Sequence, residues 1–306
     1  MSLAAPAPSD VDVVIVHFHS DRALLRRCLD SVADAAQHAD LTVTVILVDN
    51  GGSLPVELVP DGVRFVPVKS RGNIGFGSAV NLGVAAASAE AVLVLNPDAA
   101  LETPALAAFR AALQQEPEAL LVGWMTRDGQ VERDSYIDWD FSVERIVKRT
   151  RWSDDLGDGG LLPVEKVSGG ALFARTAVLR TLGPFDERFF MYCEDADLSR
   201  RARSAGRPLL AVRAARVDHA GSASETSFHP LVEAARADGA IRVTALHRPR
   251  VVSVLQRVEL ALVTTLGLAR PGLDRDARRA RWARTASLRR WRFRTQVPRM
   301  DPDHAS

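Results

Sequence analysis

The feature that most limits the fold of this chain is the alternation of β-branched apolar runs with helical stretches across its first hundred residues. Between the first two runs, apolar side chains recur at helical spacing, and Ser20 or Asp21 is placed to cap that helix. Strands that alternate with helices form βαβ units, so the sequence predicts an α/β fold with a mainly parallel sheet flanked by helices. The apolar runs are 11–18, 41–50, 63–68 and a fourth that stops at Asn96.

Polar residues follow the ends of these predicted strands. In open parallel sheets, ligands bind beyond the carboxyl ends of the strands, so we expect a nucleotide site at this edge. Neither G-x-G-x-x-G nor G-x-x-x-x-G-K-[ST] follows the first strand, which argues against a dinucleotide-binding unit and against a P-loop. The polar groups are His17 to Ser20 after the first strand, Asp49 and Asn50 after the second, and Asn96 to Asp98 after the fourth.

Composition excludes several other classes of protein. The 306 residues carry a net charge of +1, which does not favour a nucleic-acid binder overall. The two cysteines, Cys28 and Cys193, can form neither a disulfide framework nor a zinc site alone, and they fit a reducing cytoplasm. Residues 1–10 lack the charged and apolar regions of a signal peptide, so we expect a flexible tail there.

The second half of the chain has a different organisation. Residues 120–165 show no clear periodicity, so we expect loops over the sheet that contact substrate. The apolar stretch 251–269 carries Arg257 and Glu259 near its middle, which disfavours a transmembrane span and favours an interfacial or packed helix. Residues 270–299 contain eleven arginines with interleaved tryptophans, a composition that suits an anionic lipid surface. A subunit interface, a nucleic-acid tail and a solvated helix are the alternatives.

Six segments follow one another in order over residues 11–225. They are VVIVHFHS, ILVDNGGS, RGNIGFGSAVNLGV, VLVLNPDAAL, GPFDERFFMYCEDADLSRRARSAG and VDHAGSAS. Together they resemble the segments of family 2 glycosyltransferases, and within that family the bacterial rhamnosyltransferases that act on polyprenyl-diphosphate-linked sugars. The resemblance implies a GT-A domain over residues 11–228, followed by a helical, Arg-rich extension over residues 229–306.

The resemblance also implies which residues bind the donor. The Asn-Pro-Asp stretch is a typical turn sequence, and Asp49-Asn50 is equally compatible with an Asx turn. A structural role is therefore the alternative to ligand binding at both stretches. Two departures from the family pattern are His17 and His19, where the family usually has Asn, and Asn96 replaces the first acid of Asp-x-Asp. The implied nucleotide-sugar contacts are His17, Phe18, His19, Asp49, Asn50, Arg71, Asn73, Gly75, Asn81 and Asn96, and the implied ligands of Mg²⁺ or Mn²⁺ are Asp98 and His219.

Three carboxylates begin the segment EDADLSRRARSAG, and two explanations are open for them. Acidic residues in the first turn of a helix are favoured by the helix dipole, so all three could be structural. The resemblance instead implies that Asp195 is the catalytic base, that Glu194 supports it, and that Asp197 caps or braces the helix. A base of this kind needs burial and a fixed geometry.

The implied activity is that of an inverting, metal-dependent glycosyltransferase of cell-envelope biosynthesis. We expect it to move L-rhamnose from dTDP-rhamnose to a hydroxyl of a lipid-linked or polysaccharide acceptor. We expect a cytoplasmic protein, peripheral at the inner face of the plasma membrane through residues 251–299, and a homodimer is reasonable. The alternatives are a transferase that uses UDP-galactofuranose, UDP-GlcNAc or another UDP-sugar, a non-catalytic nucleotide-sugar-binding protein, and a nucleic-acid-binding protein.

Overall fold

The structure, a computed structural model, describes residues 9–153, 160–221, 230–269, 271–292 and 294–301. The strands are β1 (Val11–His17), β2 (Val43–Asp49), β3 (Arg64–Lys69), β4 (Ala91–Leu95), β5 (Ala99–Leu101), β6 (Leu120–Arg127), β7 (Gln130–Val131), β8 (Leu161–Pro163), β9 (Ala171–Arg175) and β10 (Leu209–His219). The helices are α1 (Arg22–Ala39), α2 (Phe76–Ala86), α3 (Ala105–Gln115), α4 (Ser142–Arg151), α5 (Thr176–Leu182), α6 (Glu194–Ser204), α8 (Pro230–His247), α9 (Arg250–Leu268) and α10 (Arg275–Trp291), with 3₁₀ turns η1 (Val56–Leu58) and η2 (Arg133–Ser135).

The strands form one twisted sheet in the order β3-β2-β1-β4-β9-β6-β10-β5, with β7 beside β6 and β8 beside β10. The four strands from β3 to β4 are parallel, as predicted. Beyond them the sheet is mixed, because β9 runs antiparallel to both β4 and β6. The predicted α/β fold with helices on the C-terminal side is confirmed, and the boundary expected at residue 228 lies outside the described residues.

One expectation from the sequence is wrong. Residues 120–165 were expected to be loops, but they include β6, which pairs with β10 and β9 inside the sheet, and the helix α4. The reason is that the first six residues of β6 are buried, so the strand shows no alternation of polar and apolar side chains. The loop expectation holds only for the turns around these elements.

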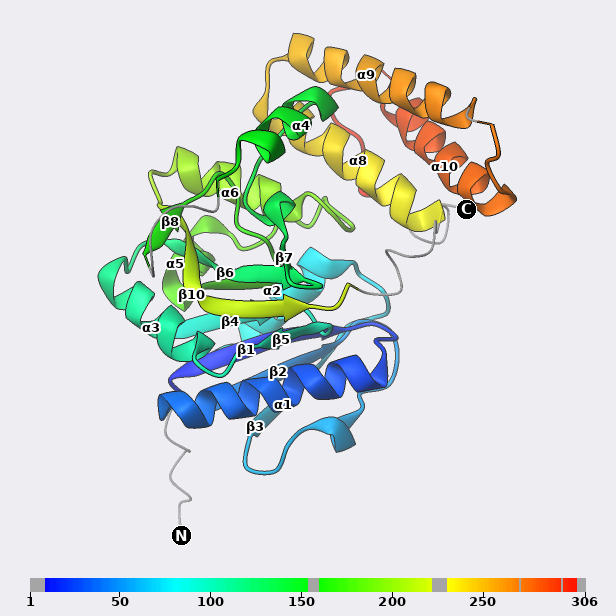
Figure 1. Cartoon of the computed structure of the whole chain (residues 1–306). Helices are drawn as coiled ribbons and strands as arrows, with labels where there is room; N and C mark the ends of the chain where they lie inside the picture. Colours follow the sequence, from blue (N-terminus) through cyan, green and yellow to red (C-terminus); the bar gives the residue numbers. More distant parts are fainter. Residues whose placement is uncertain (1–8, 154–159, 222–229, 270, 293, 302–306) are drawn as a thin grey trace.

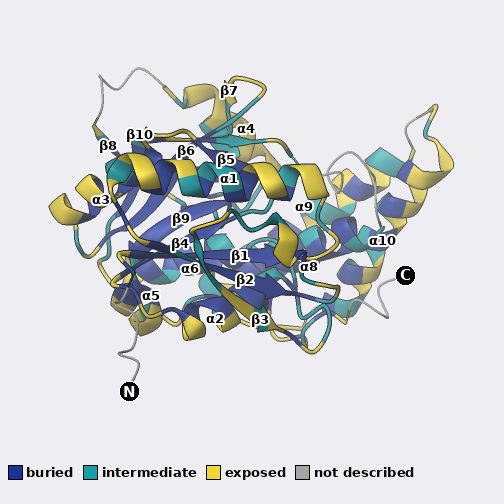
Figure 2. Cartoon of the chain, turned by 90° about the horizontal axis from the view of Figure 1, so that it is seen from below, coloured by how far each residue is buried: buried dark blue, intermediate teal, exposed yellow. Residues whose placement is uncertain are grey.

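Helices cover both faces of the sheet, and the alternation of side chains along β1 explains how (Figure 2). Val13 and Ile15 point to one face, where they join a core cluster with residues of α1 and α3. Val14 and Val16 point to the opposite face, where they pack with α2, α5 and α6. Successive strand residues face opposite sides, so the fully buried β1 requires helices on both.

The three C-terminal helices pack together beside the sheet (Figure 1). Trp291 at the end of α10 is 1% exposed, packs with Ile241 of α8, and donates its indole N–H to Asp238 Oδ1 at 2.8 Å. Arg242 donates to the same Asp238 carboxylate and to the carbonyl of Val297. The chain after α10 is therefore held against α8 by buried polar bonds.

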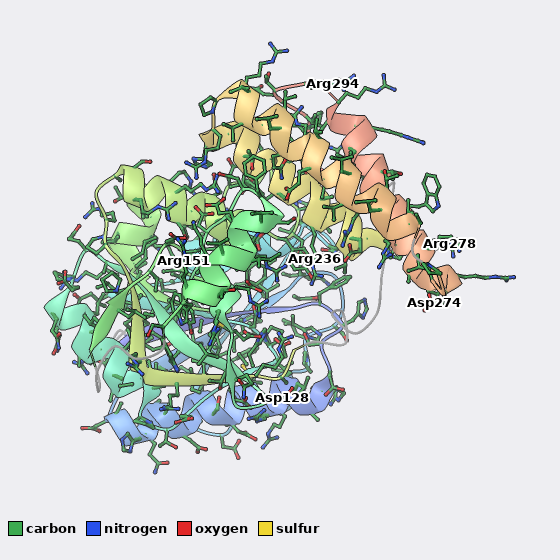
Figure 3. All side chains as sticks on the ribbon, turned by 45° about the horizontal axis from the view of Figure 1, so that its top comes forward. Asp128, Arg151, Arg236, Asp274, Arg278 and Arg294 are labelled. Carbon is green, nitrogen blue, oxygen red and sulfur yellow. The ribbon has the colours of Figure 1, made fainter. Side chains whose placement is uncertain are left out.

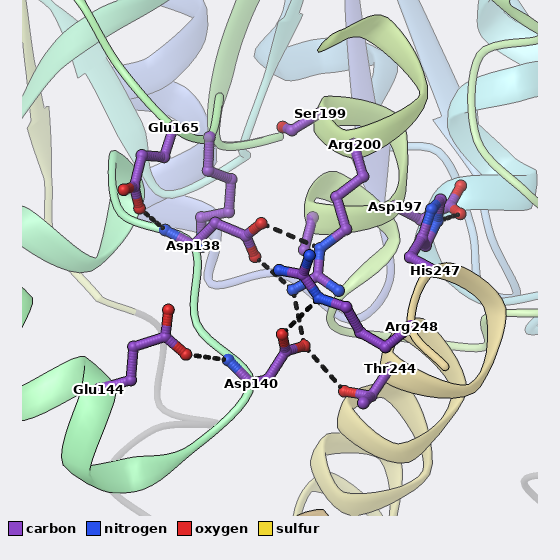
Figure 4. A network of polar contacts seen from close by, with 12 residues as sticks. Asp138, Asp140, Glu144, Glu165, Asp197, Ser199, Arg200, Thr244, His247 and Arg248 are labelled. Carbon is purple, nitrogen blue, oxygen red and sulfur yellow. Dashed lines mark hydrogen bonds and ion pairs between the residues drawn. The ribbon is translucent and has the colours of Figure 1, made fainter. Parts of the chain in front are cut away.

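A buried ion cluster connects these helices to the sheet domain (Figure 4). Arg200 of α6 binds both oxygens of Asp138, at 2.9 and 2.8 Å, and reaches Asp140 at 2.9 Å. Thr244 and Arg248, at the end of α8, both bond to Asp140. Burial alone would raise the pKa of Asp138, but its bonds from the arginines hold that pKa below the ordinary value. The cluster thus joins α6, the loop before α4, and α8.

We expect Arg200→Met to lower the free energy of unfolding by about 3 kcal/mol or more, because it leaves buried carboxylates without their shared cation. Urea denaturation followed by circular dichroism measures the change. The matched control is Arg26→Met, which removes an exposed ion pair with Asp30 and should cost less than about 1 kcal/mol. Equal costs for the two variants would contradict the role given to the cluster.

Candidate functional site

The predicted site residues gather at one edge of the sheet. His17 ends β1 and lies in register with Asp49, which ends β2, and Leu95 ends β4 opposite Ile15. The strand β10 ends at His219, which pairs with Ala99 just beyond β4. The carboxyl ends of these strands therefore meet where a doubly wound sheet offers its ligand crevice.

Side chains from β2 and from the loop before α2 form one hydrogen-bonded unit. Asn50 Nδ2 donates to Asn73 Oδ1 at 3.2 Å, and Asn50 Oδ1 accepts from the backbone N–H of Ile74 at 2.9 Å. Asp49 Oδ1 accepts from the backbone N–H groups of Gly51 and Gly52. The Asx turn considered as an alternative for Asp49 thus exists, and it holds the loop that carries Asn50.

The exit of β1 presents rings to the same region. His17 is buried, and burial lowers its pKa below the ordinary value, so the imidazole is neutral at pH 7. The Phe18 ring is 45% exposed, with the His19 ring edge-on at 4.8 Å. His19 has a left-handed backbone, with φ of 48°. The exit of β1 therefore places the exposed ring of Phe18 at the sheet edge.

Two further residues that are implied to contact the nucleotide sugar lie outside this hydrogen-bonded unit. Asn81 uses both atoms of its side-chain amide on the backbone of Phe185, donating at 2.8 Å and accepting at 3.0 Å. This residue therefore positions the loop that leads to α6. Arg71 is exposed on the loop before α2.

Gly75 explains how that loop and α2 come close to the segment before α6. Its φ is +79°, a backbone conformation that L side chains rarely adopt, and a Cβ atom would lie 2.1 Å from the carbonyl oxygen of Phe190. The next residue, Phe76, donates its backbone N–H to that same carbonyl at 3.1 Å. Glycine is thus required for the donor-side loop to lie against the segment between α5 and α6, which leads to the carboxylates of α6.

Asp98 and His219 lie together, as the resemblance implied. His219 Nε2 is 3.4 Å from Asp98 Oδ1 and 3.4 Å from Asn96 Nδ2, while Nδ1 is 3.0 Å from Glu132 Oε2. Burial would lower the pKa of His219, but the hydrogen bonds of Asp98 and Glu132 raise it to about 9. Glu132 and its ion-pair partner Arg127 could not be predicted from the sequence, because both belong to the segment without periodicity.

The arrangement fits one divalent cation shared with a ligand. Among the described residues no group of three or more His, Cys, Asp and Glu side chains could hold a metal ion by itself. Two ligands of an octahedral ion lie about 3 Å apart, since each is about 2.1 Å from the metal, and Asp98 and His219 are separated by 3.4 Å. The two side chains can therefore supply two ligands, and a bound ion would need its further ligands from outside this group of residues.

The carboxylates at the start of α6 have three different environments. Glu194 is 7% exposed, and burial, together with the neighbouring Asp195, raises its pKa to about 8. Asp195 Oδ1 accepts from the backbone N–H of Ala196 at 2.7 Å, and Oδ2 lies 3.7 Å from Lys166 Nζ. Asp197 is buried between His247 of α8, at 2.7 Å, and Arg201. The structure therefore uses Asp197 as a brace and leaves Asp195 the more accessible.

Comparison with known proteins agrees with this geometry. The sequence model of glycosyl transferase family 2 matches residues 12–173. The chain is 31% identical over 240 residues to N-acetylglucosaminyl-diphospho-decaprenol L-rhamnosyltransferase of Mycobacterium tuberculosis, covering 69% of this chain and 76% of that protein. It is 24% identical over 237 residues to rhamnosyltransferase WbbL of Escherichia coli, covering 71% of this chain and 85% of the relative.

The fold also resembles a solved structure of GalNAc-T7 with UDP, GalNAc and Mn²⁺. The TM-score is 0.59 at 16% identity, and the match covers 78% of this chain. The chain spans about half, 48%, of GalNAc-T7. At this identity the likeness shows the fold alone.

We expect Glu194→Gln to be more stable than the unmodified protein at alkaline pH. The folded chain keeps a proton on Glu194 up to about pH 8, whereas the unfolded chain releases it near 4.5, so stability falls as the pH rises between these values. The variant lacks this loss, and its Tm advantage should grow from pH 5 to pH 8.5. Differential scanning calorimetry measures it, with the exposed Glu116→Gln as control. A Tm advantage that does not change with pH would contradict the explanation that burial raises the pKa of Glu194.

Proposed function

Because the chain belongs to glycosyl transferase family 2 and is a glycosyltransferase, we propose that it moves L-rhamnose from dTDP-rhamnose to a hydroxyl of a polyprenyl-diphosphate-linked sugar. Both curated relatives are named as rhamnosyltransferases, and the name of one specifies an N-acetylglucosaminyl-diphospho-decaprenol acceptor. The observation that carries the mechanism is the accessible Asp195 carboxylate, fixed at the start of α6 beside the sheet edge that holds Asp98 and His219.

The donor would bind at the ends of β1 and β2. Asn50, Asn73 and the Asp49 turn form a preorganised wall of amide and carboxylate groups, and Phe18 offers an exposed ring on which a base can stack. The neutral His17 adds a hydrogen-bonding group without adding charge. These residues would orient the nucleotide so that the anomeric carbon faces α6.

Asp98 and His219 would hold Mg²⁺ or Mn²⁺, which neutralises the leaving diphosphate when it is bound. GT-A proteins of similar fold have been solved with Mn²⁺. His219 must release a proton before it can bind a metal, because its neighbouring carboxylates favour the imidazolium. Glu132 would then keep the ring in place by accepting from Nδ1–H, and Arg127 would hold Glu132 through their ion pair.

Asp195 would act as the general base. The acceptor hydroxyl donates its proton to the carboxylate as its oxygen attacks the anomeric carbon, the bond to the diphosphate breaks, and the configuration inverts. Glu194 holds a proton at neutral pH, so it does not add a second negative charge beside the base. The buried cluster around Arg200 fixes α6 and therefore the base.

The C-terminal helices supply the surface that we propose for a membrane. On α9 the apolar side chains Val251, Leu255, Val258, Leu262 and Leu266 recur at helical spacing and are half to three-quarters exposed. That face lies opposite Ser253, Gln256 and Thr264, which are buried against the other helices. The helix is long and apolar enough to cross a membrane by length and composition, with 22% of its apolar window buried.

The neighbouring helix α10 adds positive charge. Arg275, Arg278, Arg279 and Arg289 are exposed on one face of it, with Trp282 among them at 53% exposed. Figure 3 shows Arg278 at the end of the molecule formed by these helices. An anionic bilayer can bind an apolar face and a basic face that lie on adjacent helices. These two faces therefore fit a membrane surface better than they fit water. The proposal therefore places the protein at the inner face of the plasma membrane, beside a lipid-linked acceptor.

We expect Asp195→Asn to lower the transfer rate by a factor of at least about 100, while the affinity for the donor stays within a few-fold. The amide cannot accept the hydroxyl proton, but the donor wall is unchanged. Radiolabelled sugar transfer to a polyprenyl-diphosphate-GlcNAc acceptor gives the rate, and isothermal titration gives donor affinity. Glu187→Gln, an exposed carboxylate before the same helix, is the control.

The same titration distinguishes the alternatives. Binding of dTDP-rhamnose in preference to UDP-galactofuranose, UDP-GlcNAc and UDP-glucose supports the rhamnosyl assignment, and the reverse order would replace it. Binding without turnover in the unmodified protein would indicate a non-catalytic nucleotide-sugar-binding protein. Full activity of Asp195→Asn would overturn the assignment of the base.

We expect Leu255→Ser combined with Leu262→Ser to abolish flotation of the protein with vesicles that contain anionic phosphatidylglycerol, because it interrupts the apolar face of α9. The matched control is Val56→Ser, a similarly exposed valine on η1. The membrane proposal would be contradicted if the double variant floated as well as the unmodified protein, or if it lost dimerisation and kept its flotation. Loss of binding above about 0.5 M salt would confirm the contribution of the arginines.

A further inference from the structure

A buried lysine from another part of the chain faces the proposed base. Lys166 lies in the loop before β9, and its side chain is 12% exposed. Its Nζ is 3.7 Å from Asp195 Oδ2 and 5.0 Å from the centre of the Trp139 ring. Nothing in the sequence pattern, and none of the functions assigned above, uses this residue. A mostly buried ammonium needs a partner, and its partners here are the carboxylate and the face of the tryptophan.

The contact leaves Asp195 free to react. Oδ1 is held by the backbone N–H of Ala196, whereas Oδ2 faces Lys166 beyond hydrogen-bond distance and has no hydrogen bond within the described part of the chain. Oδ2 can therefore accept a proton from an incoming hydroxyl. An ammonium group has no lone pair, so Lys166 pairs with the carboxylate as a cation and does not compete with it for the hydroxyl proton.

The charged groups around Asp195 explain what the lysine contributes. On α6 itself lie Glu194, which keeps its proton near neutral pH, and Asp197, which is neutralised by Arg201 and His247. Arg200, the next cation on the helix, is occupied by Asp138 and Asp140. Cys193, which precedes Glu194, has its thiol pKa raised by burial and is uncharged. Lys166 thus supplies the positive charge that faces the base from outside α6.

We propose that Lys166 is a positioning residue for the base, which holds the Asp195 carboxylate oriented toward the acceptor hydroxyl. The inference rests on the proposed role of Asp195. When the hydroxyl proton passes to Asp195, the carboxylate becomes neutral and Lys166 remains an ammonium ion. The face of the Trp139 ring remains in contact with that cation at this stage, so the ammonium ion still has a partner after the proton transfer.

The test is Lys166→Met, which keeps the length of the side chain and removes its charge. Without the cation, Asp195 Oδ2 loses the group that faces it, so the carboxylate is no longer held in one orientation and kcat should fall about tenfold. The KM for dTDP-rhamnose should stay within two-fold. Lys166→Arg, which retains the charge, should restore most of the activity.

The control is Arg145→Met. Arg145 also lies over the Trp139 ring, at 5.2 Å, but it pairs with Asp134, so its removal should leave kcat unchanged. If Lys166→Met raises the KM for dTDP-rhamnose as much as it lowers kcat, or if Lys166→Arg fails to restore kcat, the lysine has only a structural role and the inference is wrong. If Asp195→Asn keeps full activity, the proposed base itself fails, which the Lys166 variants alone do not decide.

Discussion

The rest of the structure depends on one buried ion cluster, in which Arg200 binds Asp138 and Asp140. Removing these charges from water is costly, and the arrangement is stable only because the carboxylate oxygens receive donors from Arg200 and from the residues beside it. The cluster joins α6, the loop before α4 and α8, so the first turn of α6 has a fixed position relative to the sheet. The C-terminal helices thereby help to place Asp195, although they lie outside the sheet.

A second constraint acts at the edge of the sheet. Parallel strands end side by side, so residues distant in sequence, such as Asp49 and Asp98, are brought to one place. Small residues then allow the elements to approach closely. Gly83 of α2 lies where a Cβ atom would be 2.4 Å from Val14, and Gly75 meets Phe190 in the same way. The donor-side loop and the carboxylate helix therefore form one rigid border around the proposed reaction centre.

Local patterns predicted much of this from the sequence. The first four strands, the cap at Asp21 and the pairing of Asp98 with His219 follow from apolar runs and from the resemblance to a family. The central strand β6 was not predicted, because its buried residues show no alternation of polar and apolar side chains. The contacts of Glu132 and Lys166 could not be predicted either, because the partner of each lies far away in the sequence. The separate roles of Asp195 and Asp197 were implied by the resemblance, whereas the partner that braces Asp197, His247 of α8, could not be predicted because it lies 50 residues further along the chain.

The role proposed for Asp195 is to promote direct displacement of the diphosphate by the acceptor hydroxyl. The measurement that tests it most directly is the anomeric configuration of the product formed from dTDP-rhamnose, read from the one-bond carbon–proton coupling in its NMR spectrum. Direct displacement predicts a product of configuration opposite to that of the donor. A product that retains the donor's configuration would contradict the account, because it requires a second displacement or another path.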